Sequence, residues 1–228
     1  MIRIMNVNFN NSKEINFFEP SKGRPIKLNE LGAYVNEKRM STGNSKLVDI
    51  LIFDLPAGKT CMNSSSCIST CYAMKAQKMY HLTRIARETN LYMYYKEREL
   101  LKTLLIKQIT NSKNNVVRLH GSGDFISQDY INFWNEIIKV FPNKKFYAYT
   151  KVDKLLDFGT ITQNKNFNLI TSLINGELNY GSKGYIEYMV QTYNSFVCPA
   201  AASKNSDVKC GRECNYCVEN KNVVFPIH

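Results

Sequence analysis

Val116-Val117-Arg118-Leu119-His120-Gly121-Ser122-Gly123-Asp124 carries the clearest fold signal in this sequence. Its apolar, β-branched start predicts a strand, and the glycines and aspartate that follow predict a turn. Ser127 is a helix-capping residue type, and it precedes a predicted helix from Gln128 to Val140 with apolar residues at helical spacing. Lys145 to Thr150 is strand-like again. A strand, a helix and a strand in succession predict a βαβ unit with parallel strands.

The same alternation extends in both directions along the chain. Leu47 to Phe53 is a short apolar run that ends before Pro56, which predicts a buried strand. The other predicted elements are a helical region over Tyr72 to Ile109 with a break near Thr89-Asn90, a short helix over Val152 to Phe158, a strand over Phe167 to Leu173, and a further strand near Tyr185 to Val190 or at Phe196-Val197. This pattern indicates an α/β fold in which helices cover a parallel sheet. Ligands of such folds bind at the carboxyl ends of the strands.

Length and composition indicate one globular domain. The chain has 228 residues, 44% of them apolar and 21% charged, which is enough to build a sizeable core. Residues 1–45 are polar and are interrupted by Pro20, Gly23 and Pro25, so we expect an irregular lead-in. Residues 46–197 form the predicted βα domain, and residues 198–228 form a cysteine-rich, metal-binding tail packed on it.

The expected localisation indicates what the cysteines do, and the net charge indicates which partners the protein favours. The sequence shows neither a secretion signal at Met1 to Asn6 nor the roughly 18 to 20 consecutive apolar residues of a membrane-spanning helix. We therefore expect a cytoplasmic protein, in which seven cysteines indicate metal binding or redox chemistry and not disulfides. The 30 basic and 19 acidic residues give a net charge of +11, which favours a polyanion such as nucleic acid as partner, although bound thiolates would offset part of it.

The cysteines fall into a group of three and a group of four. The group of four is Cys198, Cys210, Cys214 and Cys217, and four thiolates complete the coordination of one zinc ion or one [4Fe-4S] cluster. Its last three members have the Cys-x3-Cys-x2-Cys spacing of the radical S-adenosylmethionine (SAM) cluster motif. That motif normally follows the first barrel strand, so here a structural or electron-relaying centre is predicted. Zinc is the competing occupant.

The group of three is Cys61, Cys67 and Cys71, and it lies between a predicted strand and a predicted helix, where a catalytic cluster would be expected. Three thiolates leave one iron of a [4Fe-4S] cluster open to an external ligand. Amide dipoles at the helix start would hold Cys71 as a thiolate. Arg118 and His120 are two residues apart on a strand, so we expect them on one face.

Four segments resemble the phage gene product 88 group, which is itself similar to radical SAM enzymes. They are Cys61-x5-Cys67-x3-Cys71-Tyr72-Ala73, Arg118 to Phe125, Tyr147 to Lys151 and the terminal cysteines, and the resemblance covers roughly residues 45 to 217. It implies a partial (β/α) barrel of radical SAM type with a cysteine-rich C-terminal extension. It also implies one or two [4Fe-4S] clusters, with SAM on the open iron of the cluster at the early cysteines.

The resemblance places Gly121, Gly123 and Asp124 at the SAM methionine moiety, since glycines let the backbone approach a ligand. Tyr149 and Thr171 lie at the ends of later predicted strands and are suited to hold ribose, carboxylate or substrate. An electron donor would reduce the cluster, which would cleave SAM to a radical that abstracts hydrogen from an unspecified substrate.

Two further readings stay open. The first is a non-catalytic zinc- or cluster-stabilised binding protein that acts on nucleic acid or a host protein, and the second is a protein of the same fold that keeps a cluster without turnover. In each case we expect the cytoplasm, that of the host if the protein is phage-encoded, no membrane partner, and an oligomeric state that the sequence leaves open.

Overall fold

The computed structural model describes residues 39–43, 46–62, 67–171, 183–199, 207–219 and 222–224. Most of the predicted lead-in, residues 1–38, 44 and 45, therefore lies outside the described residues. No helix among the residues described is long and apolar enough to cross a membrane.

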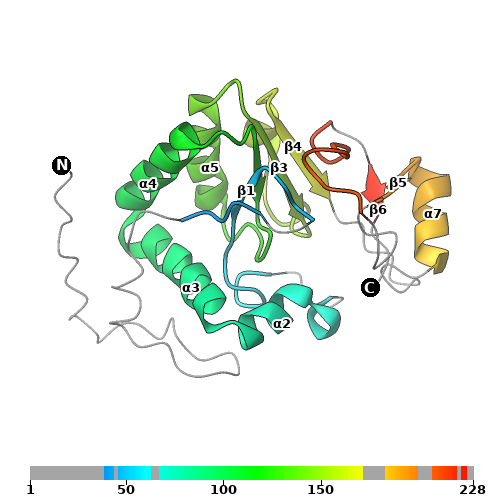
Figure 1. Ribbon diagram of the computed structural model, residues 1–228, viewed down its shortest axis with the longest axis horizontal. Helices are drawn as coiled ribbons and strands as arrows, with labels where there is room; N and C mark the ends of the chain where they lie inside the picture. The colour runs from blue at the N-terminus through cyan, green and yellow to red at the C-terminus, as the bar shows by residue number, and fades with distance from the viewer. Residues whose placement is uncertain are drawn as a thin grey trace.

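A four-stranded parallel sheet is the centre of the fold (Figure 1). Its strands are β1 (Ile50–Phe53), β2 (Val116–Leu119), β3 (Lys145–Thr150) and β4 (Phe167–Thr171), and their spatial order, β1-β2-β3-β4, is the order of the chain. This confirms the predicted α/β fold with a parallel sheet. The described strands form this open sheet, and they do not by themselves show a barrel of radical SAM type.

The C-terminal segment, of which the structure describes residues 207–219, covers one face of the sheet. Ile50, Ile52 and Tyr147 form a cluster on this face, and Cys210 and Cys217 pack against it. The segment is joined to a small two-stranded sheet of β5 (Phe196–Val197) and β6 (Val223–Val224), which lies beside α7 (Lys183–Tyr193) in Figure 1. The cysteine-rich tail is therefore part of the same packed body as the sheet.

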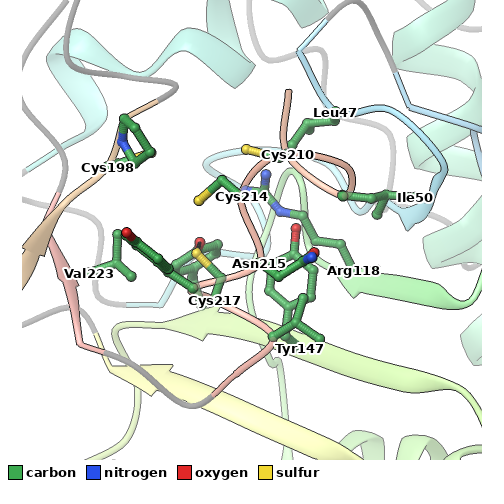
Figure 2. Close-up of a pocket in the computed structure, with 15 residues that line it drawn as sticks. Leu47, Ile50, Arg118, Tyr147, Cys198, Cys210, Cys214, Asn215, Cys217 and Val223 are labelled. Carbon is green, nitrogen blue, oxygen red and sulfur yellow. Dashed lines mark hydrogen bonds between the residues drawn. The ribbon is translucent and has the colours of Figure 1, made fainter. Parts of the chain in front are cut away.

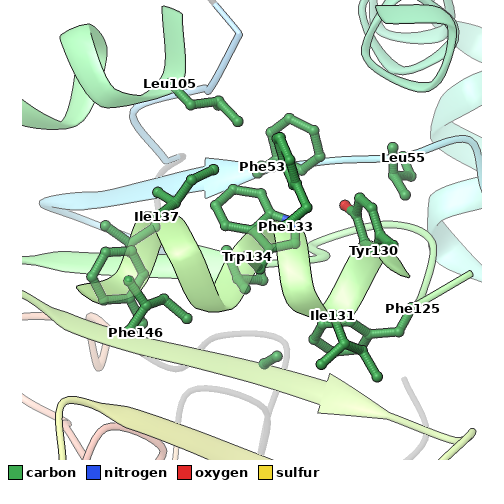
Figure 3. Close-up of a cluster of buried hydrophobic side chains, with 14 of the residues drawn as sticks. Phe53, Leu55, Leu105, Phe125, Tyr130, Ile131, Phe133, Trp134, Ile137 and Phe146 are labelled. Atoms are coloured by element: carbon green, nitrogen blue, oxygen red, sulfur yellow. The ribbon is translucent and has the colours of Figure 1, made fainter. Parts of the chain in front are cut away.

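Helices cover the opposite face. They are α3 (His81–Lys96), α4 (Arg98–Asn111), α5 (Gln128–Val140) and the short α6 (Gly159–Thr162), and their apolar residues join those of the strands in the main core. Ser127 caps α5 as predicted, because its hydroxyl accepts a hydrogen bond from the Tyr130 backbone N–H at 3.1 Å. Trp134 of α5 is fully buried against Phe53 of β1, with ring centroids 5.1 Å apart (Figure 3).

Three predicted elements need correction. The helical region from Tyr72 is three helices, α2 (Tyr72–Met79), α3 and α4, which break at Tyr80 and Glu97 and not at Thr89-Asn90. Thr89 lies inside α3, where its hydroxyl donates to the Ile85 carbonyl. Residues 152–158 form a turn at residues 153–155 with irregular chain around it, and the helix α6 begins only at Gly159. The predicted strand over residues 185–190 lies inside the helix α7, whereas the alternative at Phe196-Val197 is confirmed as β5.

Candidate metal centres

A cavity of about 60 Å³ lies between the C-terminal segment and the sheet. All four C-terminal cysteines (Cys198, Cys210, Cys214 and Cys217) line it, together with Arg118 of β2 and Tyr149 of β3. Figure 2 shows Cys210, Cys214 and Cys217 around the same space. One water molecule needs about 10–15 Å³ of such volume, so the cavity has room for a group larger than one small ion.

The C-terminal cysteines share the cavity as free thiols. In the part of the chain that the structure describes, no three His, Cys, Asp or Glu side chains are arranged to hold a metal ion. Metal binding would therefore require these thiols to turn toward a common point. Burial, reinforced by neighbouring cysteines, raises the pKa of Cys210 and of Cys217 to about 11. Without a bound metal ion these thiols stay protonated at neutral pH, and a bound metal would deprotonate them.

Arg118 is the cation in this cavity. As the strand alternation predicts, it points away from the helices, and its guanidinium carbon lies 5.1 Å from the centre of the Tyr149 ring. The Nε atom of Arg118 is buried and has no hydrogen-bond partner. The cavity thus combines four thiols with a positive charge.

Two neighbouring strands hold Cys217 in place. The Tyr149 hydroxyl of β3 donates a hydrogen bond to the Cys217 sulfur at 2.6 Å, and the Asn168 side-chain amide of β4 donates to the Cys217 carbonyl at 2.6 Å. The structure therefore places Tyr149, predicted as a cofactor ligand, at the C-terminal cysteines. Asn168 was not predicted, although a polar residue inside an apolar strand is the signal that could have found it.

The early cysteines (Cys61, Cys67 and Cys71) form a second group at the carboxyl end of β1. Cys67 precedes the one-turn 3-10 helix η3 (Ile68–Thr70), and Cys71 is the N-cap of α2. Burial raises the pKa of Cys61 and of Cys67, and charge on the other early cysteines raises both further. The three side chains are thus close enough to act on one another. The predicted polar loop at residues 63–66 lies outside the described residues, and the thiolate state of Cys71 stays a prediction.

Arg87 of α3 fixes the chain between β1 and the early cysteines. Its guanidinium pairs with the Asp54 carboxylate at 3.3 Å and donates to the Ala73 carbonyl of α2 at 2.9 Å. Asn90 also donates to the Asp54 carbonyl, at 3.0 Å. Gln77 of α2 accepts from the Ala57 backbone N–H at 2.9 Å. The loop that leads to Cys61 and the helix that follows Cys71 are therefore held to the same buried side chains.

The glycines of the loop after β2 lie against the chain that follows β1. A Cβ atom on Gly121 would come within 2.6 Å of an Asp54 oxygen. Gly123 has a φ of +82°, and a Cβ atom there would lie 2.5 Å from the Thr60 hydroxyl. Ser122 ties the two loops together, because its carbonyl accepts a hydrogen bond from the Leu55 N–H at 2.9 Å. This packing gives both glycines a structural reason, beside the predicted contact with SAM.

Replacing Gly123 with Ala should destabilise the protein by about 2 kcal/mol or more, because an L-residue at positive φ is strained and the added methyl group meets Thr60. Gly159→Ala is the matched control, since Gly159 is exposed at the start of α6 and its φ is not positive. We expect the control to be neutral or slightly stabilising. Urea denaturation measures both, and equal effects of the two substitutions would contradict the prediction.

Asp124 connects the end of β2 to the end of β3. Its carboxylate accepts hydrogen bonds from the Phe125 N–H at 2.7 Å, the Thr150 hydroxyl at 2.8 Å and the Lys151 N–H at 2.9 Å. Burial raises its pKa, although these three hydrogen bonds oppose the shift. Asp124 also lies close enough to raise the pKa of Cys61 and Cys67. It therefore borders the early cysteines and shapes the loop there.

His120 does not share the face of Arg118, which corrects the alternation argument. The strand ends at Leu119, and His120 adopts a φ of +61°, so its ring turns into the main core. There its Nε2 atom lies 3.0 Å from the Tyr130 hydroxyl, and the ring packs edge-on against Phe125. Burial, with a smaller contribution from Arg118, lowers the pKa of His120 to about 3.

This burial makes stability sensitive to acid. Between pH 6.5 and about 3 the unfolded chain binds a proton at residue 120 that the folded chain does not, so the free energy of unfolding falls as the pH falls. From pH 6.5 to 4.5 the wild type should lose about 2 kcal/mol more than His120→Asn, whose side chain tolerates positive φ. Tyr130→Phe should keep the sensitivity, because burial is its main cause. Urea denaturation at both pH values checks this, and parallel losses in wild type and His120→Asn would refute it.

Thr171 is the remaining predicted cofactor residue. It is the last residue of β4 and is exposed, pairing in register with Thr150. Its neighbour Ser172 lies outside the described residues. The carboxyl ends of β1 and β2 thus bring the early cysteines and Asp124 together, while Tyr149 lies at the C-terminal cysteines and Thr171 at the outer strand.

These features define a class: a mixed α/β protein with cysteine groups at one end and on one face of a parallel sheet. The chain belongs to the family described as "Gene product 88", whose sequence model matches residues 27–224. It is 27% identical over 110 residues to the Gene 88 proteins of Mycobacterium phages L5 and D29. These matches cover 43% of this chain and 46% of each relative, about half of its length. The relatives are phage proteins, in agreement with the predicted phage family. No solved structure matches this chain.

Proposed function

We propose that this chain is an iron–sulfur protein that holds one [4Fe-4S] cluster at the C-terminal cysteines and a second at the early cysteines. The carrying observation is the shared cavity: four cysteines from two segments of the chain line it beside Arg118, whose Nε atom is buried. Four thiolates suit either one zinc ion or one cluster. The cavity volume of about 60 Å³ favours the larger group.

The early cysteines are proposed to hold the cluster that binds SAM. Three thiol ligands leave one iron open, and a bound cluster of this kind supplies one-electron chemistry to SAM. The chain's own contribution is a fixed backbone: Asp124 accepts three hydrogen bonds that shape the loop, and the Tyr72 hydroxyl donates to the Gly121 carbonyl at 2.6 Å. Asp124 is therefore proposed as a residue that positions the loop backbone for SAM.

The sheet order supports a partial barrel of radical SAM type. Each of the four strands lies next to its predecessor in the chain, and the helices between them lie on one face. A doubly wound sheet, in contrast, reverses direction and carries helices on both faces. A (β/α) barrel has this singly wound arrangement, in which each strand lies next to its predecessor and the helices lie on the outer face. In this arrangement the C-terminal segment lies on the face that would be the barrel interior.

Metal analysis of the full chain tests the proposal. The protein is purified without oxygen, and iron, acid-labile sulfide and zinc are counted per chain. We expect about eight irons, and about four in either Cys61→Ala/Cys67→Ala/Cys71→Ala or Cys210→Ala/Cys214→Ala/Cys217→Ala. Reductive SAM cleavage should be lost with Cys67→Ala alone. Full cluster content and SAM cleavage in that variant would contradict the assignment of the early cysteines.

Zinc without iron, in both anaerobic and reconstituted samples, would favour the alternative of a metal-stabilised binding protein. The net charge of +11 then makes nucleic acid the partner to test, and the expected sign is binding that weakens steeply with salt. Nucleic-acid binding stays a prediction of the sequence.

A further inference from the structure

Arg118 has a donor that the protein does not use. A guanidinium carries five N–H groups, and the side chain of Arg118 is half-buried: its Nε atom is buried and has no hydrogen-bond partner among the residues that the structure describes. The Asp54 carboxylate is close enough for its charge to act on Arg118, but it forms its ion pair with Arg87. A buried N–H group without an acceptor is costly, and an anion in the cavity would satisfy it.

The C-terminal cysteines supply that anion once they bind metal. Four thiolates carry four negative charges, and either Zn²⁺ or a cluster core of charge 2+ leaves a net charge of −2 on the centre. Arg118 lines the same cavity, so its positive charge lies beside the four thiols that would become thiolates on binding metal.

Tyr149 contacts both the Arg118 guanidinium and the Cys217 sulfur. Its ring lies under the Arg118 guanidinium, with 5.1 Å between the guanidinium carbon and the ring centre, and its hydroxyl donates to the Cys217 sulfur at 2.6 Å. A hydrogen bond to a ligand sulfur stabilises negative charge there, as the nearby cation does. Arg118 and Tyr149 lie on the paired strands β2 and β3, and Asn168 of the next strand holds Cys217. The guanidinium and the hydroxyl therefore lie on a rigid support.

We infer that Arg118 and Tyr149 form a charge-compensating pair for the metal centre at the C-terminal cysteines and raise its reduction potential when the occupant is an iron–sulfur cluster. This rests on the proposed function. A reduced cluster is one charge more negative than an oxidised cluster, so a cation and a sulfur hydrogen bond both favour the reduced form. Both are positioning residues that tune the centre, since neither is a metal ligand.

The test uses full-length chain with Cys61→Ala/Cys67→Ala/Cys71→Ala, which leaves one centre. In this background Arg118→Met should shift the midpoint potential to a more negative value, and Tyr149→Phe should shift it in the same direction by less. Arg118→Lys keeps the charge and should stay near the parent value. Arg98→Met removes an arginine from a surface ion pair with Asp129 and should leave the potential unchanged.

Iron and zinc per chain are measured first in each sample. Absence of both metals from the C-terminal cysteines would overturn the proposed function and this inference together. A loaded cluster with the same potential in Arg118→Met and Tyr149→Phe would overturn the inference and leave the proposed function standing. If Arg118→Met binds no metal, the midpoint potential of Tyr149→Phe decides whether the inference stands. If zinc fills the centre, Arg118→Met should weaken zinc binding at least tenfold in a chelator competition, and unchanged affinity would overturn the inference.

Discussion

Arg87→Met should lower the free energy of unfolding by about 2–3 kcal/mol, because it removes the buried partner of a carboxylate that is itself only partly exposed. The Arg87 side chain is 7% exposed and that of Asp54 is 25% exposed. Burial already raises the pKa of Asp54, and Arg87 is the first of the groups that oppose this shift. Methionine keeps most of the aliphatic volume, so the loss reports the charge and its hydrogen bonds more than a cavity.

A double substitution separates the cost of leaving the Asp54 charge unpaired from the cost of losing the other Arg87 contacts. Arg87→Met/Asp54→Asn removes the stranded charge and should recover part of the stability, since a neutral amide is less costly to bury. Arg98→Met is the matched control: its partner Asp129 is 62% exposed, and such a pair contributes about 0–1 kcal/mol. Urea denaturation at neutral pH compares the variants. A loss in Arg87→Met no larger than that in Arg98→Met would show that the buried pair does not hold the loop.

The sequence was sufficient for the elements whose signals are local. Strands β2, β3 and β4 were predicted because each is a short run rich in β-branched or aromatic residues, and α5 because its apolar residues recur at helical spacing after Ser127. Part of the helix α7, Tyr185 to Val190, was predicted as one of two alternatives for a strand because of its high β-propensity, whereas the structure has a helix there that contacts β5 and β6.

Site geometry depended on contacts that no local pattern encodes. The grouping of the cysteines is visible in the chain, but only the fold places Cys198 in one cavity with Arg118 from a strand eighty residues away. His120 shows the limit of alternation, because one positive φ at the strand end turned its ring into the core. Tyr149 was predicted to contact a cofactor, and only the fold shows that its hydroxyl donates to Cys217.

Metal binding at the C-terminal cysteines should hold the C-terminal segment on the sheet. The segment has a small local core, in which Cys198 and Val223 are the buried members among the described residues, and it otherwise packs on the sheet through Cys210, Cys217 and Val218. Its docking uses two backbone hydrogen bonds, from the Val48 N–H to the Cys210 carbonyl at 3.0 Å and from the Cys210 N–H to the Lys46 carbonyl at 2.8 Å. A structural metal contributes its binding free energy to folding, so its loss should open this segment first.

Hydrogen exchange measures that opening residue by residue. In Cys210→Ser/Cys214→Ser/Cys217→Ser, the amides of Val48, Phe196 and Cys198 should exchange at least tenfold faster, which corresponds to about 1.4 kcal/mol of lost local stability. The His120 amide, bonded to the Phe53 carbonyl inside the main sheet, should keep its protection. The matched variant Cys61→Ser/Cys67→Ser/Cys71→Ser should leave all of these amides unchanged. Equal protection in both variants would mean that the segment docks through its own contacts, and the four C-terminal cysteines would then have to be explained by chemistry and not by folding.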